Sequence, residues 1–268
     1  MRTLVAIATL ALLGLASRPA LAQHDHHHHT DHADHAPAAG DAPVDEPRPF
    51  ELGVIIVGGR FDQTFYEGDY AGASVGLGWR HGRVGLHVSL PAYRLRKNGA
   101  TVDGLGDVTV GVDALAYRRG AVTAGVTVGA SLPTGDAMAG LGMGHTMLMP
   151  LAWVSRDGAR TSVGASLGWC GAIDGEGAHD HGAWPLVEPM SSSELMGDVR
   201  VDRALAGSFR GSARVLYAVP TGDDPVRVAG AIGGTWRGAR ADTGAELQAG
   251  LAGDPFTLRA LITSAVRF

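Results

Sequence analysis

The chain is poor in cysteine, lysine and aromatic side chains, and each scarcity narrows the classes of protein to which it can belong. Its 268 residues include one cysteine, Cys170, so an intrachain disulfide framework is excluded. Lysine occurs once, at Lys97. Beyond residue 22 there is no run of about 18 apolar residues, so no transmembrane helix is expected there.

Basic residues are also fewer than acidic ones. Residues 1–22 hold two of the 22 basic side chains and none of the acidic ones, so the remainder carries 20 basic and 27 acidic residues. Its net charge is −7 with histidine neutral. An acidic balance of this kind argues against a nucleic-acid partner.

Residues 1–22 have the features of a signal peptide. Arg2 gives a positive start, Leu4–Leu15 form a short apolar core, and residues 20–22 (Ala-Leu-Ala) make a small-x-small cleavage site. The alternative of a buried helix does not account for the cleavage pattern. We therefore expect this segment to direct export and to be removed. No cysteine follows the cleavage site, so a lipoprotein anchor is not expected.

Residues 23–50 are expected to be a disordered His/Asp-rich arm followed by a proline-rich linker. Seven of the 12 histidines lie in the arm, interspersed with three aspartates. Imidazole binds Zn, Cu and Ni, and carboxylate adds oxygen donors, so the composition predicts metal capture. The alternatives are a cloning tag, which the interruptions by Asp disfavour, and a solvated polar spacer. The predicted metal ligands are His24, His26, His27, His28, His29, His32, His35, Asp25, Asp31 and Asp34.

From residue 51 onward, apolar and polar residues alternate in short segments separated by Gly, Asp and Pro. A period of two predicts β-strands, and no helical segment of convincing length lies between them. In 121–132, for example, Val126 and Val128 fall on one face and Thr127 on the other. The predicted strands are 51–58, 71–80, 83–91, 105–117, 121–132, 145–155, 160–170, 194–204, 208–219, 226–236, 239–250 and 256–268.

Two features favour an antiparallel transmembrane β-barrel of about 12 strands over a soluble β-sandwich, which would also alternate. The apolar face is rich in Val, Ala and Gly and poor in large interlocking residues, which suits contact with lipid. Short connections, such as 118–120, also alternate with longer ones, which is the arrangement of outer-membrane barrels. The longer connections are expected at 59–70, 92–104, 133–144, 171–193, 220–225 and 251–255.

Tryptophans mostly lie near the ends of the predicted strands, as expected for aromatic girdles at the two membrane interfaces. The alternative is that they are ordinary core residues. In 145–155 the apolar residues do not assign the two faces of the strand. The tryptophans are Trp79, Trp153, Trp169, Trp184 and Trp236.

The last segment, 256–268, has an apolar face on which we expect Phe256 and Leu258, and a polar face with Arg259. It ends on Phe268 and resembles the closing strand of bacterial outer-membrane barrels. The resemblance implies that the partners are outer-membrane lipid and the outer-membrane assembly machinery, which would recognise the strand ending at Phe268.

Two short sequences recur in this region. Gly-Asp-Val begins strands at 106–108 and 197–199, and Pro-Thr-Gly-Asp ends strands at 133–136 and 220–223. Together they resemble a family of Gram-negative outer-membrane barrels, the transporters related to the protein of the phenol meta-degradation pathway. The resemblance implies passage of small molecules across the outer membrane, and it supplies no catalytic residues.

Charged residues on the polar face of a barrel would line its lumen. They either line a narrow channel or pair across the lumen and plug it, because buried charges need partners. A barrel of about 12 strands is wider than the filled eight-stranded barrels, which favours a narrow pore. The predicted lining is Arg83, His87, Asp107, Asp113, Asp198, Arg200, Asp202, Arg210 and Arg214, together with Arg227, Arg240, Asp242 and Glu246.

Two weaker metal positions lie in the barrel region. Met138, Met143, His145, Met147 and Met149 lie within twelve residues. They combine thioether and imidazole, a soft set that suits Cu(I), although flexible packing by Met is the alternative. The predicted metal ligands among them are Met143, His145 and Met147. His179 and His181 lie in the long 171–193 connection, on the opposite side of the membrane from the His/Asp-rich arm.

No enzyme is expected, because Ser191–Ser193 have no nucleophile motif around them. The sequence predicts an outer-membrane barrel that passes or captures small solutes. The arm links it to divalent or copper ions. The alternatives are a structural, plugged barrel and a soluble periplasmic metal-binding all-β protein.

Overall fold

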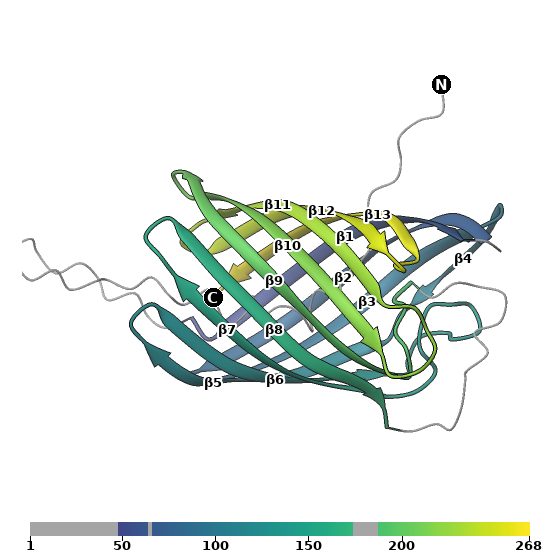
Figure 1. Ribbon diagram of the computed structural model, residues 1–268, viewed down its shortest axis with the longest axis horizontal. Coiled ribbons are helices and arrows are strands. Elements are labelled where there is room, and N and C mark those ends of the chain that lie inside the picture. The colour runs from purple at the N-terminus through teal and green to yellow at the C-terminus, as the bar shows by residue number, and fades with distance from the viewer. Residues whose placement is uncertain (1–47, 64–65, 174–186) are drawn as a thin grey trace, which may run out of the picture.

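The computed structural model describes residues 48–63, 66–173 and 187–268, and all regular elements in this part of the chain are β-strands (Figure 1). No helix among these residues is long and apolar enough to cross a membrane. The predicted signal peptide and the His/Asp-rich arm lie outside the described residues. The strands are β1 (Phe50–Gln63), β2 (Tyr66–His81), β3 (Val84–Lys97), β4 (Ala100–Leu105), β5 (Val108–Arg119), β6 (Val122–Leu132), β7 (Met147–Asp157), β8 (Thr161–Ala172), β9 (Ser193–Ala206), β10 (Phe209–Pro220), β11 (Arg227–Arg237), β12 (Ala241–Ala252) and β13 (Phe256–Arg267).

The strands form one closed antiparallel barrel. Apart from β4 and β5, strands that are consecutive in the chain pair with each other, and β1 pairs with β13 to close the ring. β4 and β5 both pair with β3: Leu105 lies opposite Ala92, and Thr109 lies opposite Ser89. They are therefore one strand interrupted at Gly106 and Asp107, so the barrel has twelve strand positions. The predicted fold is confirmed.

The two ends of the barrel differ. The first described residues, the C-terminus and the connections at 82–83, 120–121, 158–160, 207–208 and 238–240 lie at one end, here called the short-turn end. The connections 133–146 and 221–226 lie at the opposite, long-loop end. Figure 1 shows the strands tilted between these ends, with the C-terminus at the left and β4 at the right.

The outer face of the barrel is apolar along every wall. Outward-facing residues such as Leu77, Val112, Val128 and Ile262 are each at least 40% exposed. Near the short-turn end the outward positions become aromatic, and Phe50 stacks on Phe268 with 6.0 Å between ring centroids. This aromatic girdle consists of Phe50, Trp79, Tyr117, Phe209, Trp236 and Phe268.

The predicted extent of the first strands needs correction. Most of 59–70 and 92–104 is strand rather than loop, because β1, β2 and β3 extend beyond the apolar band. Charged pairs hold this extension together: Arg94 Nε donates to Asp103 Oδ1 at 2.6 Å.

Two further corrections concern which face a residue occupies. Phe256 faces the lumen, because a register shift between Arg60 and Phe61 changes the parity at the start of β13. Trp153 does not belong to a girdle: it lies on the inward face of β7 and is 3% exposed. Trp184 lies outside the described residues.

The lumen at the long-loop end is filled by an aromatic cluster. Residues of β1, β2, β3 and β13 contribute most of it, and the flanking loops add Leu141 and Val187, whose backbone N–H donates to Gly140 at 3.1 Å. The cluster consists of Val57, Phe61, Tyr70, Tyr93, Leu95, Leu141, Val187, Phe256 and Leu261. Loop residues therefore enter the barrel at this end.

Candidate functional site

The inward face of the barrel is polar, as the alternation predicts. In the β5–β6 wall, Thr109, Asp113 and Thr127 point inward and are each under 5% exposed. Hydroxyls pair across neighbouring strands: Ser74 and Ser89 approach to 3.1 Å, and Thr123 and Ser155 to 2.7 Å. These contacts satisfy polar groups that would otherwise be buried without partners.

The half of the lumen next to the short-turn end contains a cavity of about 140 Å³. Its wall combines hydroxyls, the His87 imidazole and charges of both signs, contributed by β1, β2 and β3 and by β9 to β13. The charged residues that line it are Glu51, Arg200, Arg214, Arg237, Asp242 and Glu246.

Many of these charges are paired. Arg214 Nη2 lies 2.7 Å from Glu246 Oε1, and Gln248 Nε2 donates to the same oxygen at 2.6 Å. Arg200 Nε lies 2.8 Å from Asp202 Oδ2. The charges therefore combine features of both predicted alternatives: they form ion pairs with one another, and they line a cavity in the lumen.

His87 is held in a defined orientation on the opposite wall. Its Nδ1 lies 3.2 Å from Asp113 Oδ2, and Thr127 Oγ1 donates to Asp113 Oδ1 at 2.6 Å. The ring lies over Gly111, where a Cβ atom would come within 2.2 Å of His87 Nε2. The absence of a side chain at Gly111 therefore leaves the space that the imidazole occupies.

At the long-loop end, buried polar contacts tie the loops to the wall. Asp107 accepts hydrogen bonds from the backbone N–H groups of Gly135, at 2.8 Å, and Met143, at 2.7 Å. Tyr93 Oη donates to Glu188 Oε1 at 2.6 Å. These bonds anchor the loops inside the mouth of the barrel, so this end is constricted.

Opposite the aromatic cluster lies a second buried group, here called the sulfur cluster. β7, β8, β9 and the adjoining loops contribute its side chains, and Ala218 of β10 packs against them. His145 Nε2 lies 2.9 Å from Met147 Sδ. The sulfur cluster consists of Met143, Met147, Met149, Cys170, Met190 and Met196.

Most predicted lining residues lie on the inward face. Asp113, Asp198 and Arg214 are buried there, and Arg210 Nη2 donates to Ser162 Oγ at 3.0 Å. Asp107 lies in the wall but holds a loop rather than lining the cavity. The further predicted residues on this face are His87, Arg200, Asp202, Arg227, Asp242 and Glu246.

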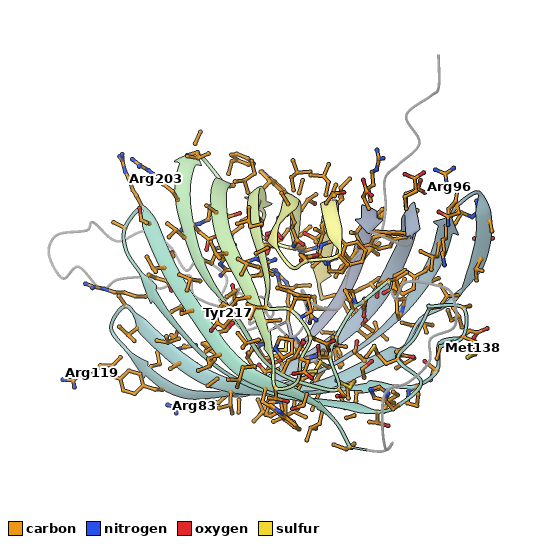
Figure 2. The ribbon with its side chains drawn as sticks, turned by 45° about the vertical axis from the view of Figure 1, so that its right-hand side comes forward. Arg83, Arg96, Arg119, Met138, Arg203 and Tyr217 are labelled. Atoms are coloured by element: carbon orange, nitrogen blue, oxygen red, sulfur yellow. The ribbon has the colours of Figure 1, made fainter. Side chains whose placement is uncertain are left out.

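Arg83 and Arg240 do not line the lumen, so this part of the prediction is wrong. Both are exposed in short turns, and Figure 2 shows Arg83 projecting from the short-turn end. Polar and apolar residues still alternate in the sequence of these turns, but the side chains there no longer alternate between the lumen and the outer face. Arg237 and Glu51 line the cavity and were not predicted, although their parity within the strands marks them.

The predicted metal positions divide into two groups. Met143, His145 and Met147 come together with other sulfur ligands, whereas the arm histidines, His179 and His181 lie outside the described residues. Among the residues that the structure describes, no group of three or more His, Cys, Asp or Glu side chains could hold a metal ion. The sulfur cluster instead offers thioether donors.

No family model and no curated protein matches the chain. Solved structures do match it. A crystal structure of an outer-membrane channel from Pseudomonas putida F1 has a TM-score of 0.67 at 15% identity, covering 85% of this chain and all of that one. The KdgM porin (7% identity) and the NanC porin (12% identity) each have a TM-score of 0.53, covering 81% of this chain and 99% of theirs. At these identities the likeness is one of fold, and the link to a phenol pathway stays a prediction.

Proposed function

We propose that this chain is an outer-membrane channel through which small polar solutes pass along a narrow, charged lumen. The observation that carries the proposal is the cavity of about 140 Å³ inside a closed barrel whose outer face is apolar. A closed barrel satisfies every backbone group of its wall, which is the condition for crossing a bilayer with strands. The three similar solved structures described above are an outer-membrane channel and two porins.

The orientation in the membrane follows from the two ends. The short-turn end would face the periplasm, as in bacterial outer-membrane barrels. Arginines there extend beyond the aromatic girdle, where they would meet lipid phosphate groups; Figure 2 shows Arg83, Arg119 and Arg203 at this end. The exposed arginines of this collar are Arg83, Arg118, Arg119, Arg156, Arg160, Arg203 and Arg240.

The lumen would act as a chamber with a constricted outer mouth. The charged cavity would occupy the periplasmic half of the lumen, whereas the aromatic and sulfur clusters would fill its outer half. Solutes would pass when the loops that Asp107 and Tyr93 hold move away from the wall. Size and charge in the cavity would then select what passes.

Metal ions are the solutes that the chain's composition favours. The His/Asp-rich arm precedes Arg48, the first described residue, and would lie beside the periplasmic opening. Seven imidazoles on a short tether raise the local concentration of a bound ion at that opening. We propose Zn, Cu or Ni as the bound ion.

Conductance in planar lipid bilayers tests the proposal. The purified full-length chain should first shift in gel mobility on boiling, which identifies a closed, detergent-resistant barrel. Such a preparation should then give discrete conductance steps. A heat-modifiable protein without conductance would instead be the plugged, structural barrel that the filled outer mouth favours. Recovery in the soluble periplasmic fraction would overturn both.

A further inference from the structure

We propose that the sulfur cluster in the outer half of the lumen is a binding site for a soft monovalent cation of the Cu(I) class. The inference deepens the proposed function by naming an ion within the barrel itself. It does not rest on transport, since an ion can bind there whether or not the barrel conducts.

The cluster concentrates nearly all the sulfur of the protein at one place. The chain has seven methionines and one cysteine, and five of those methionines and the cysteine belong to the cluster. Met147 and Cys170 are 0% exposed, and Met196 is 4% exposed. Cys170 Sγ lies 3.6 Å from Met190 Sδ.

The register of four neighbouring strands brings these side chains to one level. Met147 lies opposite Ala172, and Met196 lies opposite both Gly168 and Ala218. Paired inward residues on adjacent strands stand within about 5.5 Å of each other at the backbone. Small partners at 168, 172 and 218 leave the space between the strands to the long thioether side chains.

Packing alone does not explain the composition. Methionine fills irregular gaps well, and that is the competing account of the cluster. The aromatic cluster fills the other side of the same mouth, however, and contains only Val, Leu, Phe and Tyr. A cluster that served packing would have no reason to hold only sulfur-bearing side chains and alanine in its buried core.

A nitrogen and an oxygen ligand lie at the same place. His145 is 4% exposed, and its Nε2 lies 2.9 Å from Met147 Sδ. Glu194 is 0% exposed, lies opposite Cys170 in the register, and uses Oε2 to pair with Arg227 and the Ser191 N–H. Its buried Oε1 accepts no hydrogen bond from any residue that the structure describes.

This donor set selects the ion. Thioether and thiolate sulfur prefer Cu(I), whereas Ca²⁺ and Mg²⁺ prefer sets of oxygen ligands. On binding, the Cys170 thiol would lose its proton to water and form the S–metal bond, so the site would gain no net charge. Charge neutrality matters here, because the site is buried beside an apolar wall.

Ag(I), a redox-stable ion of the same class, is the probe. Full-length protein with ¹³C-methyl methionine is titrated with silver in detergent, after heat-modifiability has shown that the barrel is folded. One equivalent should shift the methyl signals of the cluster methionines and leave that of Met138, which is 62% exposed, in place. Methyl signals report the cluster directly, so silver held by the arm histidines is not mistaken for silver at the cluster, and the titration continues until both are saturated.

Matched variants test affinity. Met147→Leu with Met196→Leu keeps the apolar volume and removes two thioethers, and should weaken Ag(I) binding on the order of tenfold or more. Met138→Leu is the control and should leave affinity unchanged. Cys170→Ala should abolish the release of one proton per bound ion. Unmoved methyl signals, or equal affinity in the wild type and the double variant, would overturn the site while leaving the conductance proposal standing.

Discussion

Asp107 Oδ2 accepts a hydrogen bond from the backbone N–H of Met143 at 2.7 Å, and this bond joins the barrel wall to a loop that fills its mouth. Asp107 interrupts the strand between β4 and β5, and its other oxygen accepts from Gly135. One carboxylate thus holds both arms of the 133–146 loop. The same loop supplies the sulfur cluster with Met143.

Asp107→Ala should open the outer mouth. It removes two hydrogen bonds to a charged acceptor, each worth about 1.5–3 kcal/mol, so the loop should leave the wall more often. Single-channel recording should show larger or longer openings than in the wild type. Asp103→Ala, which breaks only an exposed ion pair on the outside, is the control. Equal conductance in Asp107→Ala and the wild type, with the barrel folded, would show that this loop does not close the channel.

Gly111→Ala should destabilise the barrel. The new methyl group would come within 2.2 Å of His87 Nε2, so the ring would have to give up its place beside Asp113. Overpacking of this kind costs roughly 1–3 kcal/mol. The temperature at which gel mobility changes should therefore fall.

The control for this substitution lies directly across the strand pair. Gly129 is the register partner of Gly111, and a Cβ atom there meets its nearest neighbour, Met149 Cε, only at 3.5 Å. Gly129→Ala should change the transition temperature little. An equal fall in both variants would show that loss of glycine itself, rather than the position of His87, sets the stability.

Alternation along single strands predicts the fold, because each strand reports its two faces independently. Val126 and Thr127 fall on the faces that their polarity predicts. Alternation assigns the wrong face where contacts with neighbouring strands, rather than position along the strand, determine whether a side chain points inward or outward. Phe256 turns inward through a register shift. Trp153 fits inside the barrel because residue 125 is glycine: a Cβ atom at Gly125 would lie 2.5 Å from the indole ring.

The candidate sites divide in the same way. Polar residues within a strand, such as Asp113 and Arg214, are placed in the lumen by parity alone. The sequence grouped Met143, His145, Met147 and Met149 correctly, but it also included Met138, which is exposed outside the cluster. Cys170 and Met196 join the cluster through pairing with distant strands. The pattern of residues within one strand does not reveal how that strand is aligned with its neighbours.

Arg214→Gln should make the channel more selective for cations. The side chain of Arg214 pairs with Glu246 at 2.7 Å, and its loss leaves the cavity wall more negative. The reversal potential across a KCl gradient should shift in the direction of cation selectivity. Adding Glu246→Gln removes the compensating charge and should return the selectivity toward that of the wild type. A reversal potential that neither variant changes would place the conduction path elsewhere.

Deletion of residues 24–35 should abolish Ni(II) capture by the full-length protein at pH 7. Neutral imidazole is the metal ligand and has an ordinary pKa of about 6.5. Capture by the wild type should therefore fade below about pH 6, as the histidines become protonated. Equilibrium dialysis at pH 5 and pH 7 measures both effects. Affinity that is the same at the two pH values would point to carboxylate ligands.

Val112→Arg should destabilise the barrel in lipid. Val112 faces outward near the middle of the apolar band and is 45% exposed. An arginine at the bilayer midplane costs about 2–4 kcal/mol, whereas one near the interface costs about 0–1. Tyr117→Arg, on the same strand in the aromatic girdle, is the matched control. Urea unfolding in phospholipid vesicles should show a large loss of stability for the first variant and little for the second. Equal losses would mean that the apolar face does not contact the hydrocarbon core as a band, because depth along β5 would then not matter.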